Sequence, residues 1–450
     1  MATSDLATRI LTGDASLWGP ASSAPTRLGW VDLLAKSYES LLDLTRWAES
    51  IDQSKILVLG SGAVAQAART YFDFLLNHKL APQRQVVVID STDPRSIADV
   101  DLSDTAVIVS SSSGTTMEDQ ALFGFFYARL RRPERFFAIT EANSTLDVMA
   151  REMGFKRVFN SPEKVGERFS AFAEVGLVPA ALAGMDLFEL IEGAKKTDVG
   201  SYVALGEMWG ANANAGVTAV EMVHGREDDA LAAWSEQMLT LGSAQHSNGL
   251  LPVSCHAPAG SYSRSHFAFS PKTIAEFAQH LYGVQFAAAG AGYALGIDPF
   301  WEYEPAANEA RTLGILSGQL RAPTLPESDF AGLGEYLTPM MRPGEYATLS
   351  AYQPLDFEEQ LNQETSRLAE RLDANPLTAG LAPRHIYSTG RFHTLCPIGA
   401  HVVQVVSRDY GPKVTIPEMD SDFNALIVAQ ADAQALALIE AGKSVTRIYN

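Results

Sequence analysis

The sequence predicts an α/β fold of two doubly wound sandwich domains, each with a parallel sheet covered by helices on both faces. First, apolar segments rich in Val, Ile and Leu alternate with segments of helical period. Second, these segments are apolar throughout, as is typical of strands buried on both faces. Third, Gly-rich or Ser-rich turns directly follow two of the predicted strands, where α/β folds place their ligands.

The first predicted domain covers residues 26–195 and follows an N-terminal arm at 1–25 without clear periodicity. Apolar residues at helical spacing predict one helix over 31–51. Regular alternation then predicts strands at 55–59, 85–90, 106–110, 136–140 and 157–159, and helices at 64–76, 94–99, 120–130 and 144–153. An apolar helical connector is expected over 175–202.

The second predicted domain covers residues 196–450, including a C-terminal helix, and its elements are less regular. We expect strands at 249–255, 346–352 and 402–407, and helices at 214–241, 272–296, 357–373 and 424–441, the last leading into 444–449. The segment 302–344 is rich in Pro, Gly and acids, so we expect it to wrap over the surface.

Composition excludes several classes of protein. The 34 Lys and Arg residues against 53 Asp and Glu residues give a net charge of −19, which argues against duplex nucleic acid or an anionic membrane as partner. Two cysteines, Cys255 and Cys396, are too few for a disulfide framework or a cysteine zinc site. The N-terminal residues lack a signal-peptide pattern, and the apolar stretches are too short to span a bilayer, so we expect a cytoplasmic protein.

A serine-rich stretch carries the clearest functional signal. The apolar run ending at Ser110 is followed by three more serines, a glycine and two threonines, and then by a helical pattern. The start of a helix offers backbone N–H groups and a favourable dipole, so the loop is a candidate phosphate site. The alternative is that these residues only form a turn and cap the helix.

Five motifs, in the same order, resemble those of the phosphoglucose isomerase family. The serine loop is similar to the family's S-K-S-G-T-T-x-E, and P-R-x-L-H-S-T-G-Q-L-H is characteristic of the branch fused to transaldolase in some bacteria. The segments that carry the resemblance are 111–118, 164–170 with 175–184, 236–238 with 248–253, 295–300 and 383–393. The resemblance extends from about residue 50 to the C-terminus.

The resemblance implies paired sugar-isomerase (SIS) domains, usually in a homodimer, and no metal or other cofactor. The implied reaction interconverts glucose 6-phosphate and fructose 6-phosphate by proton transfer through an enediol. A phosphorylated hexose is then the expected partner, and the branch also suggests transaldolase. Two alternatives stay open: a sugar-phosphate-binding protein with impaired catalysis, and an isomerase or epimerase for a different sugar.

The expected phosphate-binding residues come from two turns. In the serine loop they are Ser111, Ser113, Thr115 and Thr116, and in the turn after the first strand they are Gly60 and Ser61. Ser112 stands at the family's lysine, so the loop has less positive charge to offset a phosphate.

The catalytic positions are more divergent. Arg168 matches the arginine that stabilises the enediol, although an interdomain ion pair is an alternative role. Leu241 falls on the catalytic glutamate and cannot accept a proton, whereas Glu236 matches an earlier position of that motif. Glu304 and Arg311 resemble an active-site glutamine and lysine of the family, which makes Glu304 a candidate base. A solvated acidic segment is the alternative for Glu304.

Three histidines are candidates for opening the sugar ring. His246 lies beside the altered glutamate motif, His280 lies on a predicted helix, and His393 lies in the 383–393 motif. We take His393 as the catalytic candidate, because Arg391 and Thr389 flank it.

Overall fold

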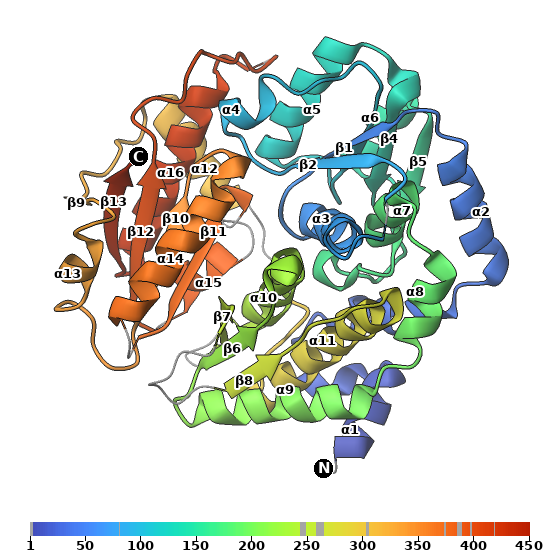
Figure 1. Cartoon of the computed structure of the whole chain (residues 1–450), viewed down its shortest axis with the longest axis horizontal. Coiled ribbons are helices and arrows are strands. Elements are labelled where there is room, and N and C mark those ends of the chain that lie inside the picture. Colours follow the sequence, from blue (N-terminus) through green and yellow to red (C-terminus); the bar gives the residue numbers. More distant parts are fainter. Residues whose placement is uncertain are drawn as a thin grey trace.

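The computed structural model describes residues 3–80, 82–243, 249–257, 265–302, 306–372, 375–384, 389–396, 398–417 and 419–450. Within these ranges no helix is long and apolar enough to cross a membrane. The described residues form three parallel sheets, which occupy separate parts of the molecule (Figure 1). The α/β fold class with parallel sheets is therefore confirmed.

The first sheet has five parallel strands in the order β2-β1-β3-β4-β5. Its strands are β1 (Lys55–Leu59), β2 (Gln85–Ile89), β3 (Thr105–Ser110), β4 (Phe136–Thr140) and β5 (Arg157–Asn160). The helices of this half are α1 (Thr3–Leu11), α2 (Tyr38–Glu49), α3 (Gly62–Asn77), α4 (Pro94–Ile97), α5 (Met117–Leu130), α6 (Thr145–Glu152), α7 (Glu174–Ala183) and α8 (Leu187–Ala194).

Both faces of this sheet are apolar because both are covered. Ile56 and Val58 of β1 pack in the core on the side of α3 and α7, whereas Leu57 and Leu59 pack in a second core on the side of α5. Successive side chains of a strand point to opposite faces, so an unbroken apolar run is what a doubly covered strand requires.

Two helix predictions in this half were wrong in their extent. The helix expected over 31–51 is a 3-10 helix at Gly29–Ala35 followed by α2, because the Ser37 side chain accepts the N–H of Ser40 and starts a new helix. The connector expected over 175–202 is divided among α7, α8 and the start of α9 (Val199–Asn214). Gly184, at φ +90°, ends α7, and Asp186 caps α8.

The described part of residues 196–450 contains two sheets. A three-stranded sheet has the order β7-β6-β8, with β6 (Ala219–Val223), β7 (Leu251–Cys255) and β8 (Ser265–Ala268). Its helices are α9, α10 (Asp229–Ser243) and α11 (Ile274–Leu295). α10 also packs on α3 of the first half, so it joins the two parts of the chain.

The third sheet has the order β11-β10-β12-β13-β9 and is parallel throughout. Its strands are β9 (Glu327–Ser328), β10 (Tyr346–Ala351), β11 (Leu377–Leu381), β12 (Ala400–Val406) and β13 (Ser444–Tyr449). The helices around it are α12 (Ala306–Leu316), α13 (Leu333–Leu337), α14 (Glu358–Leu372), α15 (Thr389–Leu395) and α16 (Phe423–Glu440).

Several expectations for this half need correction. The helix expected over 214–241 is wrong in its first part, where strand β6 is the buried central strand of a sheet and includes the buried Glu221; only the later part is helical, in α10. The segment 302–344 does more than wrap the surface, because its α12 packs on α16 and its β9 pairs with β13. Strands β8 and β11 were not predicted from the sequence. The two domain boundaries, near residues 26 and 196, stay a prediction.

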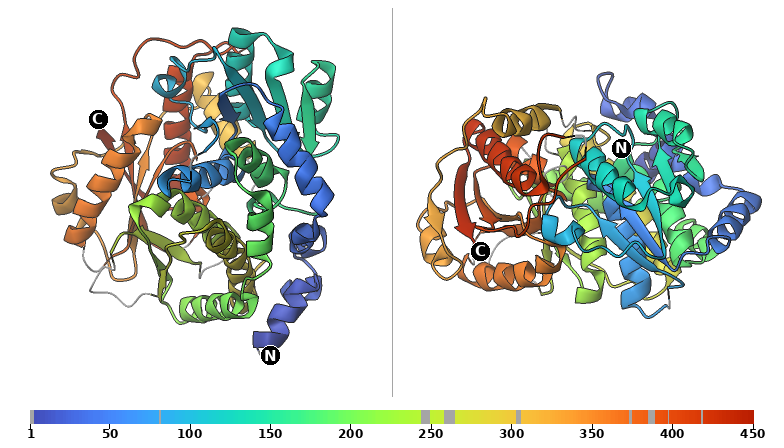
Figure 2. Two further views of the ribbon diagram at one scale, coloured as in Figure 1. Left: turned by 45° about the vertical axis from the view of Figure 1, so that its right-hand side comes forward. Right: turned by 90° about the horizontal axis from the view of Figure 1, so that it is seen from above.

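The first and third sheets meet where strands end. Asp90 directly follows β2, an edge strand, and Arg384 follows β11, also an edge strand. Their side chains form an ion pair with 2.7 Å between Arg384 Nε and Asp90 Oδ2. Figure 2 shows the first and third sheets as neighbouring blocks in both views. Carboxyl ends of parallel strands therefore face the junction, where a ligand is expected.

Candidate functional site

The serine loop, residues 111–116, joins β3 to α5 at the carboxyl edge of the first sheet. Its hydroxyls already hold part of its backbone: Gly114 N–H donates to Ser111 Oγ over 3.2 Å, and Thr115 N–H donates to Ser113 Oγ over 3.1 Å. Ser113 and Thr115 are exposed, and their hydroxyls are 2.8 Å apart. The loop is thus preformed and open to solvent on one side.

A carboxylate from another element lies at the start of α5. Met117 N–H donates to Glu309 Oε1 of α12 over 3.0 Å. An anion is favoured at the N-terminus of a helix, and here the chain supplies one itself. The free N–H groups expected of this loop are therefore fewer than the sequence suggested.

The turn after β1 lies beside the serine loop, as the sequence predicted. A Cβ on Gly60 would come within 2.5 Å of the Ser110 carbonyl oxygen, so only glycine allows this approach. The Asp119 carboxyl accepts hydrogen bonds from Ser61 and Ser111 and joins the two turns. Burial raises the pKa of Asp119 to about 7. Asp119 was missed because nothing in the letters distinguishes it from an ordinary first-turn acid of a helix.

Arg168 is buried and is held mainly by backbone carbonyls. Its guanidinium donates to the carbonyls of Pro299 over 2.9 Å, Trp301 over 2.8 Å and Met238 over 3.4 Å. Desolvation lowers the pKa of Arg168 to about 10, so it stays charged at neutral pH. Within the described residues, Arg168 thus links the two halves of the chain through hydrogen bonds to carbonyls rather than through an ion pair. A guanidinium has five N–H donors, so donors remain that can bind an oxyanion.

Two carboxylates lie near Arg168 and the serine loop. Glu302 Oε1 accepts the backbone N–H of Glu167 over 2.6 Å, and Glu302 Oε2 pairs with Arg27 over 2.9 Å. The Glu167 carboxyl accepts a hydrogen bond from Ser112. Burial, together with the neighbouring Glu302 charge, raises the pKa of Glu167. Ser112, which stands where the resemblance expects a lysine, thus contacts a glutamate.

Two other predicted catalytic residues, Arg311 and His393, contact other parts of the molecule. Arg311 pairs with Glu440 of α16 over 2.6 Å. The ring nitrogens of His393, which is 1% exposed, lie 2.8 Å from the Tyr346 hydroxyl and 3.3 Å from Thr348 Oγ1. Glu304, the candidate base, lies outside the described residues.

The altered glutamate motif is only partly described. Leu241 lies in the last turn of α10, but its side chain and all of His246 lie outside what the structure describes. His280 is buried on α11, where its Nε2 lies 2.9 Å from Ser235 Oγ. Burial lowers the pKa of His280 to about 3, so this ring is neutral and packed in the core.

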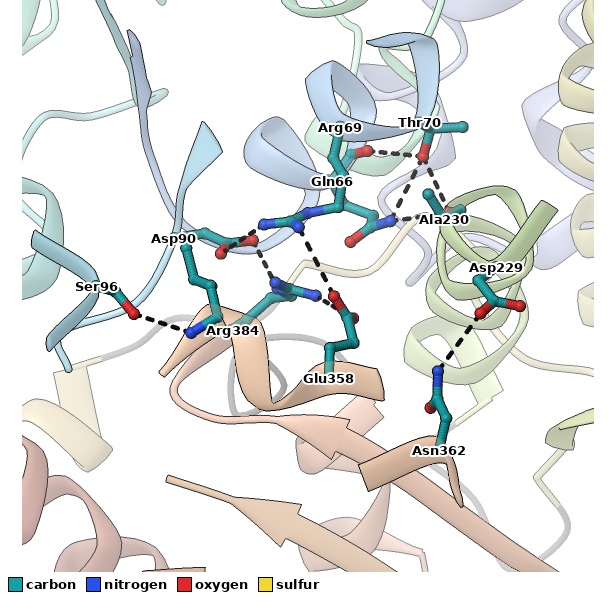
Figure 3. Close-up of polar contacts among 11 residues, drawn as sticks. Gln66, Arg69, Thr70, Asp90, Ser96, Asp229, Ala230, Glu358, Asn362 and Arg384 are labelled. Atoms are coloured by element: carbon teal, nitrogen blue, oxygen red, sulfur yellow. Dashed lines mark hydrogen bonds and ion pairs between the residues drawn. The ribbon is translucent and has the colours of Figure 1, made fainter. Parts of the chain in front are cut away.

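A cavity of about 680 Å³ lies between α10 and β7 on one side and α14 and β11 on the other; we call it the interdomain cavity because Gln66 of α3, in the first half of the chain, also lines it. Arg384 in its wall lies between Asp90 and Glu358, with 2.9 Å to Glu358 Oε1, and Arg69 Nη2 reaches Asp90 over 3.0 Å (Figure 3). Glu236 also lines the cavity. Burial raises the pKa of Glu236 to about 8, although Ser254 N–H donates to it over 3.3 Å.

Comparisons with known proteins agree with the motifs. No family model matches the chain. Glucose-6-phosphate isomerase from Bacillus cytotoxicus is 34% identical over 191 residues, which cover 37% of this chain and 42% of that protein. The same enzyme from Bacillus thuringiensis (strain Al Hakam) is 33% identical with the same coverage. The match spans less than half the length of these relatives.

Among solved structures, a glucose-6-phosphate isomerase from Chlamydia trachomatis is 18% identical and covers 70% of this chain and 77% of its own, with a TM-score of 0.47. A hypothetical protein from Thermus thermophilus is 17% identical and covers 99% and 83%, with a TM-score of 0.46. The resemblance to phosphoglucose isomerases is therefore confirmed by the curated relatives over part of the chain. Placement beside the transaldolase-fused branch stays a prediction.

Proposed function

We propose that the protein is a sugar-phosphate aldose–ketose isomerase of the glucose 6-phosphate to fructose 6-phosphate type. The partial identity to glucose-6-phosphate isomerases supports the reaction class. The observation that carries the proposal is that Glu167 and Arg168 stand side by side in sequence, with Glu167 hydrogen-bonded to the serine loop. A base beside a fixed cation is what proton abstraction from a carbon next to a carbonyl requires.

In this proposal the Glu167 carboxylate takes the proton from one carbon of the open-chain sugar and returns it to the neighbouring carbon. Its raised pKa suits this task, because a base acts best when its pKa lies near the working pH. The Arg168 guanidinium stabilises the negative charge of the enediolate. Glu167 thereby takes over the role that Leu241 cannot perform.

Glu302 and Glu304 are the competing candidates for the base. Glu302 is engaged by Arg27 and by the N–H of Glu167, which favours a role in holding the 166–168 segment in place. Replacing each of the three glutamates by Gln separates these roles. We expect Glu167→Gln to lower kcat at least about 100-fold, within the range of general base catalysis. Glu163→Gln, on the same segment but exposed, is the matched control.

Isomerisation is tested by incubating the protein with fructose 6-phosphate and coupling glucose 6-phosphate to a dehydrogenase. Exchange of the substrate's C1 or C2 hydrogen with deuterated water, followed by NMR, detects the enediol step at low turnover. We expect both signals. An isomerisation rate no higher than that of a blank, together with no hydrogen exchange at high protein concentration, would contradict the proposal. If the protein shows no activity but its Tm rises with sugar phosphates, the result would support the alternative of a sugar-phosphate-binding protein without catalysis.

One observation favours a second candidate, an isomerase of an unphosphorylated sugar. Ser112 replaces a lysine, Glu167 contacts it, and Glu309 already occupies the start of α5. Carboxylates placed where a phosphate would bind repel it. Deuterium exchange with glucose, mannose and fructose beside their 6-phosphates decides between the two candidates. A homodimer and a transaldolase partner, which the resemblance implies, and a cytoplasmic location, which the sequence composition predicts, are further parts of the proposal.

A further inference from the structure

A second cluster of chemical groups lies at the wall of the interdomain cavity. One nitrogen each from His224 and His256, and one carboxylate oxygen from Asp229, all lie within 4.8 Å of one another. His256 Nε2 is 2.8 Å and His224 Nδ1 is 3.5 Å from Asp229 Oδ1. Zn²⁺ binds nitrogen and oxygen at about 2.0–2.2 Å, so atoms sharing one ion sit roughly 3–3.5 Å apart. The distances between these nitrogen and oxygen atoms are therefore close to those between atoms that bind one metal ion.

The sheet brings the two histidines together. β6 and β7 are parallel neighbours with Val223 opposite Cys255, so the next residues, His224 and His256, leave the sheet side by side. The His224 N–H donates to the Cys255 carbonyl over 3.1 Å and holds these strand ends together. Asp229 is the first residue of α10, which returns along the same edge. Carboxyl edges of parallel sheets are where α/β proteins bind ligands.

The surrounding hydrogen bonds orient the ligand atoms. His224 Nε2 lies 2.6 Å from Ser254 Oγ, and Nδ1 faces Asp229 and lies 2.9 Å from the Gly225 carbonyl, so a bound ion would take the place of the Nδ1–H bond to that carbonyl. The Asn362 amide of α14 donates to Asp229 Oδ2 over 3.4 Å and leaves Oδ1 for His256 (Figure 3). Histidine ligands of metals commonly use their second nitrogen in this way.

We propose that His224, Asp229 and His256 bind one divalent transition-metal ion of the Zn²⁺ class at the wall of the interdomain cavity. Two imidazoles and one carboxylate form the donor set of many zinc sites, in which a fourth position is left for water or substrate. Asp229 and His256 line the cavity, so the open side of the ion faces that space. This site is separate from the serine loop, and it stands whether or not the protein is a sugar-phosphate isomerase.

The proposed binding is measured on the full-length, untagged protein after dialysis against a chelator. We expect isothermal titration with Zn²⁺ to give one ion per chain, Tm to rise with Zn²⁺, and Co²⁺ to give the visible absorption of a histidine-ligated ion. Asp229→Asn and His256→Gln should each weaken Zn²⁺ binding at least about 100-fold, because each removes a direct ligand. Asn362→Ala should weaken it about 10-fold, as is typical for a partner of a ligand.

His266→Gln is the matched control. His266 Nδ1 also pairs with a carboxylate, Glu221 Oε2, over 2.8 Å, and it belongs to the same sheet on β8. This variant should bind Zn²⁺ like the parent protein. His224 is buried, so the partly exposed Asp229 and His256 carry the test without a risk to folding. Absence of one-to-one binding by the parent protein, or equal binding by the Asp229→Asn and His256→Gln variants, would overturn the proposal.

Discussion

The serine loop and the interdomain cavity both lie at carboxyl ends of parallel strands, yet they differ in what marks them and in what they contain. The serine loop is recognisable in the sequence, but its neighbours are the carboxyl groups of Glu167, Asp119 and Glu309. Two of the family-like motifs reach the wall of the interdomain cavity through Glu236 and Arg384, but the histidine cluster there belongs to none of them. A family motif therefore identifies the fold of a region more securely than the charge of its ligand.

The largest effect is expected for Arg168, whose side chain joins the segment beside the serine loop to Met238 of α10. Arg168→Ala should abolish isomerisation and lower the free energy of unfolding by about 3–5 kcal/mol, because it removes a buried charge and its hydrogen bonds to three carbonyls. Activity assays and urea unfolding measure the two effects. Arg168→Lys should recover part of the stability and little of the activity. An unchanged rate in Arg168→Ala would remove this arginine from the mechanism.

The next largest effect is expected at the cavity. Asp90→Ala should lower the free energy of unfolding by about 3 kcal/mol. Asp90 is buried between Arg69 and Arg384, so its loss leaves two cations facing each other. Urea unfolding measures it. Asp43→Ala is the control, since Asp43 and Arg46 form an exposed pair at 4.0 Å and should contribute less than about 0.5 kcal/mol. Equal costs would mean that the Asp90 network does not hold the sheets together.

A smaller effect is expected within the serine loop. Gly114→Ala should lower the free energy of unfolding by about 2 kcal/mol, because Gly114 has φ +73° and an added Cβ would lie 2.5 Å from Leu146 Cβ. Gly154→Ala shares the positive φ, +75°, but meets open space, so about 1 kcal/mol is expected there. Thermal unfolding of the two variants separates strain from crowding. If the two costs match, the close packing under the loop is not important for stability.

The smallest expected effect depends on pH. The pKa of Asp119 in the folded protein, about 7, lies above its ordinary value of 3.8. The protonated carboxyl therefore contributes to the free energy of unfolding below pH 4, and this contribution is lost as the pH rises to 7. Asp119→Asn should therefore be more stable than the parent protein at pH 8, by on the order of 1–2 kcal/mol. The difference should shrink toward pH 4. Urea titrations at both pH values test this, and a pH-independent difference would contradict it.

The first sheet was predictable because each strand is apolar on both faces and each helix follows it closely, as β1 and α3 illustrate. The sheet formed by β6, β7 and β8 was harder to foresee. Its central strand carries a buried glutamate, Glu221, and β6 is followed within a few residues by a helix, so the letters resemble one amphipathic helix. Tertiary packing, rather than local preference, decides such segments.

The site was predictable only where it follows from the arrangement of the strands. The serine loop and the turn at Gly60 meet because β1 and β3 are adjacent strands. The contact between Ser112 and Glu167 was not foreseeable, since it depends on how the 166–168 segment folds back across the sheet edge. Glu309 and Arg311 lie on one helix, yet the first reaches the serine loop and the second reaches α16.

The register of β6 and β7 also bears on the order in which the chain folds. The three proposed metal ligands all lie within residues 224–256, whereas the surroundings of the serine loop draw on residues from Arg27 to Glu309. Closing a short loop costs less conformational entropy than closing a long one. Bringing the histidine cluster together therefore requires the closure of a shorter loop than completing the surroundings of the serine loop, which needs distant segments to dock.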